Sequence, residues 1–381
     1  MKLLSRTCLF VMTVCSLQLY GQGLTRVNSE TPTLKDAFRA HFSLGTAMGH
    51  RQISGSDTAS LKIIKMHFNA IVAENAMKSM YLQPIENQFD FEQADRFVDF
   101  GVKNGMKIIG HTLIWHSQTP DWFFKDSLGN EISRDLLIQR MEKHIKTVVG
   151  RYRGRVNGWD VVNEAVTDDG KWRRSKFYDI IGERFFALAY KFAQEADPEA
   201  ELYYNDYNTA IPKKREGIAE KVLQLKKAGI RIDAIGMQQH NSLSFPLIGE
   251  IERSINRFSE LGLKILITEL DVDVLPPTDN GPTAEVSSVE TYRENLDPYV
   301  GDLPEEKMKK LGDRYLSLFE LYLRHREKIE RVTLWGVSDS DSWLNNFPIR
   351  GRTNYPLLFD RDFKPKSFVK DIIGLGYRFP E

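Results

Sequence analysis

The sequence predicts a single (β/α)8 TIM barrel of the α/β class, and three observations lead to this prediction. Short apolar runs rich in valine, isoleucine and leucine alternate along the chain with longer amphipathic runs. Eight such pairs follow one another, the number of strand–helix units that closes a parallel barrel. The 381 residues carry 41% apolar side chains, enough for one large core, and no linker or repeat divides them.

The predicted strands are nearly continuous apolar segments, as expected for parallel strands that are covered on both faces. They are Phe42–Met48, Phe68–Ala73, Lys107–Leu113, Val156–Val162, Glu201–Asp206, Ala234–Gln238, Lys264–Leu270 and Val332–Val337. A doubly wound open sheet is the alternative, but no Gly-x-Gly-x-x-Gly motif follows any of these strands.

The predicted helices place apolar residues on one side, at intervals of three and four. In Arg134–Val149, for example, Leu137, Met141 and Ile145 share a face. The other predicted helices are Asp57–His67, Glu92–Asn104, Phe177–Ala196, Pro212–Ala228, Pro246–Leu261, Glu305–Lys328 and Lys366–Ile373.

The first 21 residues have the three parts of a secretory signal peptide. Lys2 and Arg6 give a positive start, an apolar run extends to Leu19, and the small residue Gly21 follows. The apolar run is too short for a comfortable membrane span, and no other segment of the sequence could cross a membrane. We therefore expect export to a periplasm or to the outside of the cell, with residues 22–381 forming one mature domain. A buried N-terminal helix is the alternative.

The composition excludes several classes of protein. Both cysteines, Cys8 and Cys15, lie in the signal segment, so the mature chain has no disulfide and no thiol for catalysis or metal binding. The balance of 52 Lys and Arg against 52 Asp and Glu argues against a nucleic-acid-binding protein. The high apolar content excludes a disordered chain. We expect a monomer without a membrane span.

Polar side chains gather where the predicted strands end, which in such a barrel is the face that carries the chemistry. Glu164 and Glu269 end the fourth and seventh strands, which face each other across the barrel mouth. Two carboxylates that converge on one bound group suit hydrolysis of a glycosidic bond, in which one donates a proton and the other attacks. The alternative is two unrelated acids on the rim, but each of these belongs to a polar cluster.

His240 and Asp271 follow the sixth and seventh strands. A chain of contacts from Glu269 to His240 to Asp271 would orient the attacking carboxylate and stabilise its charge. The alternative for His240 is an ordinary core histidine. His111 and His116 lie near the strand-end acids, but their spacing matches no metal-binding motif, so we expect neither a metal nor another cofactor.

Trp115, Trp335 and Trp343 are three of the six tryptophans of the chain, and all three lie at strand ends. A single tryptophan there would usually belong to the core. Three together indicate a carbohydrate site, because the apolar faces of sugar rings stack on aromatic rings while their hydroxyls bind polar side chains.

Seven motifs lie at the predicted strand ends: Glu74-Asn-Ala-Met-Lys78, Gly110-His-Thr-Leu-Ile-Trp-His116, Trp159-Asp-Val-Val-Asn-Glu-Ala165, Tyr204-Asn-Asp-Tyr-Asn208, Gly236-Met-Gln-Gln-His240, Ile267-Thr-Glu-Leu-Asp271 and Trp335-Gly-Val-Ser-Asp-Ser-Asp-Ser-Trp343. Through them the sequence resembles the family 10 glycoside hydrolases, which are endo-β-1,4-xylanases, over essentially the whole mature chain. The resemblance implies hydrolysis of xylan or xylo-oligosaccharides by a retaining double displacement.

The resemblance also implies a role for each residue of the site. It makes Glu164 the acid/base and Glu269 the nucleophile, and it assigns Asn163 to the 2-hydroxyl of the sugar at the cleavage point. It places His240 next to the carboxylates, and the bulk of Trp343 favours xylose over glucose, which carries a hydroxymethyl group. The substrate-binding residues that it implies are Glu74, Asn75, Lys78, His111, Trp115, Gln118, Tyr207, Gln238, Trp335 and Trp343.

Two segments depart from the family pattern or are individual to this chain. Ser79-Met80-Tyr81 follows Lys78, where the family usually has a tryptophan, so one stacking surface is missing or replaced. The proline-rich loop Leu275–Ser288 after the seventh strand is expected to shape the cleft near the nucleophile. Two other functions stay open: a related barrel hydrolase acting on cellulose or β-glucan, and a carbohydrate-binding barrel without catalysis.

Overall fold

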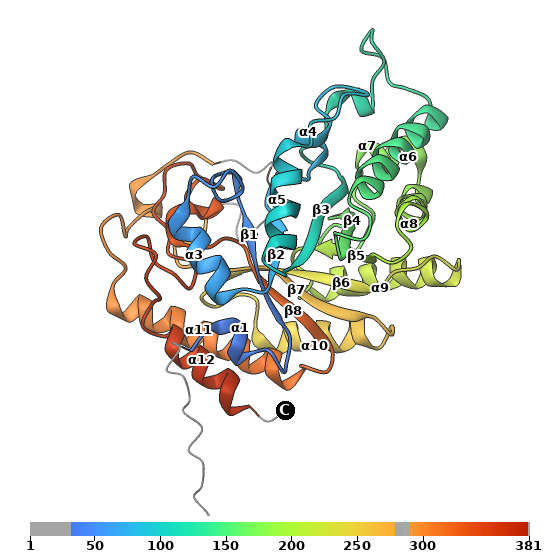
Figure 1. Ribbon diagram of the computed structural model, residues 1–381. Helices are drawn as coiled ribbons and strands as arrows, with labels where there is room; N and C mark the ends of the chain where they lie inside the picture. Colours follow the sequence, from blue (N-terminus) through green and yellow to red (C-terminus); the bar gives the residue numbers. More distant parts are fainter. Residues whose placement is uncertain (1–31, 279–285, 287–289, 380–381) are drawn as a thin grey trace, which may run out of the picture. The chain divides into compact units, whose positions relative to one another are not determined.

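The structure is a computed structural model that describes residues 32–278, 286 and 290–379. Within these residues, eight parallel strands close into one barrel in the order β1 to β8, and helices connect successive strands (Figure 1). The predicted (β/α)8 barrel is therefore confirmed. The predicted signal segment, residues 1–21, lies outside the described residues, as do residues 279–285 and 287–288 of the loop after the seventh strand.

Most strands begin and end close to their predicted positions. They are β1 Ser43–Met48, β2 Ala70–Ala73, β3 Lys107–Trp115, β4 Gly158–Asn163, β5 Glu201–Asp206, β6 Ala234–Ser242, β7 Lys264–Asp273 and β8 Ile329–Leu334. The prediction for β8 was wrong by three residues, because Gly336 takes a φ of 133° and the chain leaves the barrel before it. The strands β3, β6 and β7 extend beyond their predicted ends, and these extensions carry several of the site residues.

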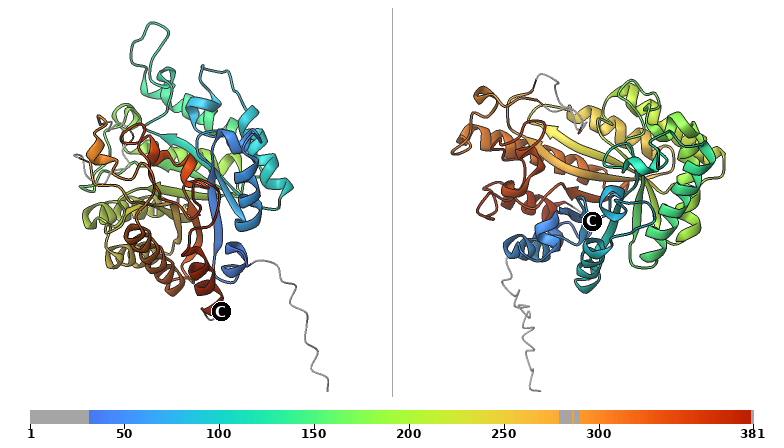
Figure 2. Two further views of the ribbon diagram at one scale, coloured as in Figure 1. Left: turned by 90° about the vertical axis from the view of Figure 1, so that its left-hand side faces the viewer. Right: turned by 90° about the horizontal axis from the view of Figure 1, so that it is seen from above.

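Helices surround the barrel, and those after β4 and those after β7 lie on opposite sides of it (Figure 2). The predicted helix Phe177–Ala196 is two helices, because Gly182 takes a left-handed φ of 81° that ends the first of them. The helices of six or more residues are α3 Thr58–His67, α5 Glu92–Lys103, α6 Arg134–Arg151, α7 Lys176–Ile181, α8 Arg184–Ala196, α9 Pro212–Lys227, α10 Ile248–Ser259, α11 Glu305–Arg324 and α12 Val369–Arg378. Short helical turns are α1 Leu34–Ala37, α2 His50–Ile53, α4 Ser79–Leu82, η1 Asp121–Phe123, η2 Glu294–Leu296, η3 Asp339–Asp341 and η4 Trp343–Asn345.

The barrel is held by two apolar layers. The larger one lies between the strands and the surrounding helices, where the apolar helix faces pack. A smaller cluster, in which Trp335 and Tyr203 are the largest side chains, joins residues of β1, β2, β3, β5, β6 and β7 with Trp335, which follows β8. Because Trp335 belongs to this cluster and also lines the pocket described below, the interior packing supports the floor of the site.

Two glycines in the strands make room for side chains from a neighbouring strand. A Cβ on Gly110 would lie 2.1 Å from the indole ring of Trp159, which is buried. A Cβ on Gly236 would lie 2.3 Å from the side-chain oxygen of Asn205. The first glycine therefore allows a tryptophan in the barrel wall, and the second allows an asparagine at the barrel mouth.

Gly110→Ala should lower the free energy of unfolding by about 1–3 kcal/mol, because the added methyl group overpacks a wall that Trp159 already fills. Urea denaturation measures the change. The matched control is Gly150→Ala in α6, where a Cβ meets no atom within 4 Å. This control should be neutral or stabilising by up to about 1 kcal/mol, since alanine favours helix over glycine. A Gly110→Ala protein as stable as the wild type would contradict this view of the wall.

Candidate active site

Glu164 and Glu269 both occupy an unusual backbone conformation at the barrel mouth. Their φ values are 57° and 55°, in the left-handed region that residues other than glycine rarely adopt. Glu164 follows the last residue of β4, and Glu269 lies at an irregularity in the pairing of β7 with β8. Such strain persists where the surrounding structure holds it, and it gathers at functional sites.

Glu164 is buried, with 3% of its surface exposed, and neutral donors surround its carboxylate. The indole Nε1 of Trp115 donates to Oε2 over 2.8 Å, and the amides of Asn163 and Gln238 each donate to Oε1 over 3.1 Å. Burial raises the pKa of Glu164, and the nearby carboxylates of Asp206 and Glu269 raise it further, although His116 acts in the opposite direction. Glu164 is therefore suited to hold a proton.

Glu269 is also buried, but its partners favour the ionised form. Asn205 Nδ2 donates to Oε1 over 2.6 Å, and His240 Nε2 lies 3.1 Å from Oε2. Burial alone raises the pKa of Glu269, but the hydrogen bond from His240, the electrostatic influence of His111 and the bond from Asn205 together bring it below its ordinary value. Glu269 is therefore suited to be a carboxylate when Glu164 is a carboxylic acid.

His240 lies between two acids, as the sequence predicted. Its Nδ1 is 3.0 Å from Asp271 Oδ2, and its Nε2 faces Glu269. Burial opposes protonation, but the charge of Asp271 and the bonds to both carboxylates raise the pKa of His240 to about 10. At neutral pH both ring nitrogens therefore carry protons and donate. Trp343 Nε1 also donates to Asp271 Oδ2 over 2.8 Å, which fixes this acid in place.

Asn163 and Asn205 connect the two catalytic candidates. Asn205 Nδ2 donates to Asn163 Oδ1 over 3.0 Å as well as to Glu269, and Asn163 Nδ2 donates to Glu164. Thr268 Oγ1 donates to Asn205 Oδ1 over 2.6 Å, so the orientation of this amide is determined. Asn205 is a site residue that was not predicted, although the motif Tyr204-Asn-Asp-Tyr-Asn208 contains it.

Thirteen of the fifteen predicted site residues line one pocket of about 130 Å³, together with Val286. Lys78 Nζ donates to Gln118 Oε1 over 2.8 Å and to Asn75 Oδ1 over 3.0 Å, which joins the residues after β2 to those after β3. The pocket residues are Glu74, Asn75, Lys78, His111, Trp115, Gln118, Asn163, Glu164, Gln238, His240, Glu269, Trp335 and Trp343.

The remaining two predicted residues lie just outside this pocket. Asp271 contacts it only through His240 and Trp343, while the ring of Tyr207 packs against Lys214, whose Nζ is 3.6 Å from the ring centroid. One supporting residue was missed: Asp160 Oδ2 lies 2.9 Å from His111 Nδ1 and holds that ring at the pocket wall. The motif Trp159-Asp-Val-Val-Asn-Glu-Ala165 contains Asp160, but its place inside a strand, away from the strand end, did not mark it as a site residue.

Among the described residues, no group of three His, Cys, Asp or Glu side chains is arranged to hold a metal ion. Nor does any helix in the described ranges have the length and apolar character needed to cross a membrane.

The sequence model of glycosyl hydrolase family 10 matches residues 33–374. This chain belongs to glycosyl hydrolase family 10. The resemblance seen in the motifs is thus confirmed, and the eight-stranded barrel with its two strand-end glutamates is the barrel of a family 10 protein.

Curated family 10 relatives cover nearly all of the chain. The Endo-1,4-beta-xylanase A of Xylanibacter ruminicola is 46% identical over 92% of this chain and 95% of its own length. The Endo-1,4-beta-xylanase of Geobacillus stearothermophilus is 41% identical over 91% and 99%. A solved structure of a novel GH10 endoxylanase from a sugarcane soil metagenome superimposes with a TM-score of 0.88 and 47% identity, covering 90% of this chain and 99% of that chain.

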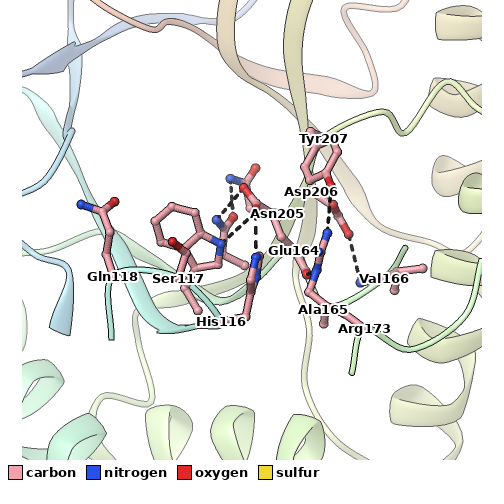
Figure 3. Close-up of polar contacts among 12 residues, drawn as sticks. His116, Ser117, Gln118, Glu164, Ala165, Val166, Arg173, Asn205, Asp206 and Tyr207 are labelled. Atoms are coloured by element: carbon pink, nitrogen blue, oxygen red, sulfur yellow. Dashed lines mark hydrogen bonds and ion pairs between the residues drawn. The ribbon is translucent and has the colours of Figure 1, made fainter. Parts of the chain in front are cut away.

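In this family 10 site a second set of contacts fastens the segment that carries Glu164 (Figure 3). Arg173 Nε donates to the backbone oxygen of Glu164 over 2.9 Å, and its Nη2 donates to the Tyr207 hydroxyl. The carboxylate of Asp206 accepts from the Val166 backbone N–H, and Lys214 Nζ lies 2.9 Å from its other oxygen. Asp206 therefore holds the backbone next to Glu164 and adds a negative charge beside it.

At the position after Lys78, where the resemblance leads us to expect a tryptophan, the chain has a buried serine. Ser79 is the first residue of α4, and its hydroxyl lies 3.3 Å from Thr119 Oγ1. The next two side chains, Met80 and Tyr81, are 42% and 48% exposed. The segment after Lys78 thus begins with a small, buried polar residue and presents Tyr81 on the surface nearby.

Asp271→Asn should lower the pKa of His240 from its value of about 10, because the substitution removes the charge that stabilises the imidazolium. NMR titration of the imidazole resonances measures the change. His144 is an internal control, since burial alone lowers its pKa to about 4 and it lies outside the site. A His240 pKa that is the same in both proteins would contradict the electrostatic role of Asp271.

Proposed function

We propose that this protein is an endo-1,4-β-xylanase that cleaves internal β-1,4 bonds of xylan and retains the configuration at the anomeric carbon. Its membership of glycosyl hydrolase family 10 supports the reaction class, and the relatives above are named for this activity. One observation carries the assignment of roles. Glu164 and Glu269 line the same pocket, but burial raises the pKa of Glu164, while the hydrogen bonds from His240 and Asn205 and the influence of His111 lower the pKa of Glu269.

In the proposed first step, Glu269 attacks the anomeric carbon while Glu164 gives its proton to the departing glycosidic oxygen. The carbon–oxygen bond to the leaving sugar breaks as an ester bond to Glu269 forms. In the second step, Glu164, now ionised, takes a proton from water, and the resulting hydroxyl displaces Glu269. Two inversions at the same carbon give net retention.

The neighbours of Glu269 support this role for it. The imidazolium of His240 donates to Oε2, which keeps the attacking group ionised and directs its other oxygen. Asn163 Oδ1 accepts from both Asn205 and Gln238, so its Nδ2 is turned toward Glu164 at the centre of the pocket. From there it can donate to a sugar 2-hydroxyl, a contact that strengthens as positive charge develops on the ring.

The walls of the pocket support a pentose substrate. Lys78, Gln118 and Asn75 offer donors and acceptors for sugar hydroxyls. Trp335 and Trp343 supply aromatic surfaces for the apolar sugar face. Trp343 donates a hydrogen bond to Asp271, and its ring stacks on that of Phe347 with the ring centroids 4.9 Å apart. Trp343 therefore has little freedom to move aside for a hydroxymethyl group. We therefore favour xylan over cellulose or another β-glucan.

We also propose that residues 1–21 direct export and that residues 22–381 form one catalytic domain which acts as a monomer. The charged start, apolar run and small residue of the first segment support the export proposal. Export would bring the enzyme to a polymeric substrate that cannot enter a cell.

On a linear xylo-oligosaccharide, the first product should carry the β anomer, because two displacements restore the starting configuration. Proton NMR during the first minutes, before mutarotation, identifies the anomer. An initial α anomer would contradict the double displacement. Carboxymethylcellulose, tested in parallel, should be hydrolysed at a much lower rate, and equal rates would contradict the xylan preference.

Glu269→Gln tests the role of Glu269 as the nucleophile, since the substitution removes the carboxylate but keeps the size of the side chain. Turnover should fall by at least about a thousandfold. The far-ultraviolet circular dichroism should stay unchanged, which separates loss of chemistry from loss of fold.

The dependence of kcat/KM on pH should be bell-shaped. Activity falls at acidic pH as Glu269 gains a proton, and this limb lies low because the pKa of Glu269 is lowered. Activity falls at basic pH as Glu164 loses its proton, and this limb lies high because burial raises the pKa of Glu164.

Glu164→Gln tests this assignment when it is assayed on an aryl β-xyloside whose leaving group needs no proton. The basic limb should vanish, and only a fall near the His240 pKa of about 10 should remain. A basic limb unchanged from the wild type would contradict Glu164 as the acid.

A further inference from the structure

A second, larger cavity of about 910 Å³ lies beside the pocket of the two glutamates. It is lined by the residues that follow β6 and β7 and by one face of α11. His240 and Trp343 line both the cavity and the pocket. A group in the cavity is therefore within reach of a substrate bound at the cleavage point.

Arg314, on the face of α11 that lines this cavity, is a buried cation with few partners. Only 7% of its surface is exposed, and its Nη2 donates to the backbone oxygen of Pro246 over 2.5 Å. Its Nε has no hydrogen-bond partner within the described ranges. No carboxylate of residues 32–278, 286 or 290–379 lies within ion-pair distance of it. A buried guanidinium without a counter-ion is costly, and such a group is a natural ligand for an anion.

Lys307 lines the same cavity two turns earlier on α11, and it too lacks a carboxylate partner among the described residues. The acids that line the cavity are already engaged. Asp271 is bonded to His240, Asp273 accepts from Asn354 over 2.7 Å, and Asp313 pairs with Lys309 at 2.6 Å. The unengaged charge of the cavity is therefore positive.

The position of the cavity limits what this anion can be. The backbone of xylan carries no charge, so a negative group next to the cleavage point must belong to a substituent of the polymer. A planar carboxylate matches the forked donors of a guanidinium. A sugar ring fits a cavity of this size, and its apolar face suits the aromatic and proline residues of the wall.

We propose that this cavity binds a uronic-acid substituent of xylan, with the carboxylate held by Arg314 and Lys307. The inference rests on the proposed function. It makes the enzyme selective for acidic xylan and assigns this selectivity to α11 and the ends of β6 and β7, away from Glu164.

The test compares two polymers that differ only in charge: xylan substituted with glucuronic acid, and the same material with its carboxyl groups reduced to alcohols. The wild type should show a kcat/KM ratio of roughly ten in favour of the acidic polymer, as expected for one charged hydrogen bond. Arg314→Met should bring the ratio close to one. Lys307→Gln, at a less buried position, should lower it by about threefold and carries the test if Arg314→Met does not fold.

Arg324→Gln is the matched control, because it removes a positive charge from the last turn of the same helix outside the cavity. Its ratio should equal that of the wild type. A wild-type ratio of one, or a wild-type ratio in both cavity variants, would overturn the uronic-acid site. Failure to hydrolyse a linear xylo-oligosaccharide would instead overturn the proposed function, so the two results are distinguishable.

Discussion

The burial of two carboxylates in one pocket is the constraint on which the rest of this structure depends. Two ionised acids could not share such a site, because each charge is poorly solvated and repels the other. The protein resolves this by giving the acids different partners. Neutral indole and amide donors surround Glu164, while the imidazolium of His240 faces Glu269. The difference in protonation that hydrolysis needs is therefore built into the resting site.

The barrel makes this arrangement possible because its strands bring distant parts of the chain to one mouth. The amide chain from Glu164 to Glu269 passes through residues of β4 and β5, and it needs the space that Gly236 leaves on β6. Trp335 joins the interior packing to the pocket floor. Stability and geometry of the site are thus supplied by the same contacts.

The proposed uronic-acid cavity also depends on which charged groups have partners in the structure. His240 and Trp343 serve the reaction on one side and line the cavity on the other. Asp271, which raises the pKa of His240, also lines this cavity, so its charge is engaged before any ligand binds. Arg314, by contrast, finds a single hydrogen-bond acceptor in the part of the chain that the structure describes, the backbone oxygen of Pro246. The cavity that selects the substrate and the pocket that carries out the reaction would then share the side chains of His240 and Trp343, while Arg314 would serve the cavity alone.

The sequence by itself determined the fold class and the chemical type of the site. Hydrophobic period, turn residues and strand-end motifs are local, so they identified eight strand–helix units and thirteen of the residues that line the pocket. The tertiary structure alone decided the contacts between residues that lie far apart in the chain. Asn205 donates to Asn163 on the neighbouring strand, Asp160 holds the ring of His111, and Arg314 lines the larger cavity. These placements depend on strand register and barrel closure, which no local pattern encodes. The left-handed backbone of Glu164 and Glu269 belongs to the same class, because no glycine marks either position in the sequence. The break at Gly182, in contrast, is local, since glycine adopts this φ at a helix end without strain.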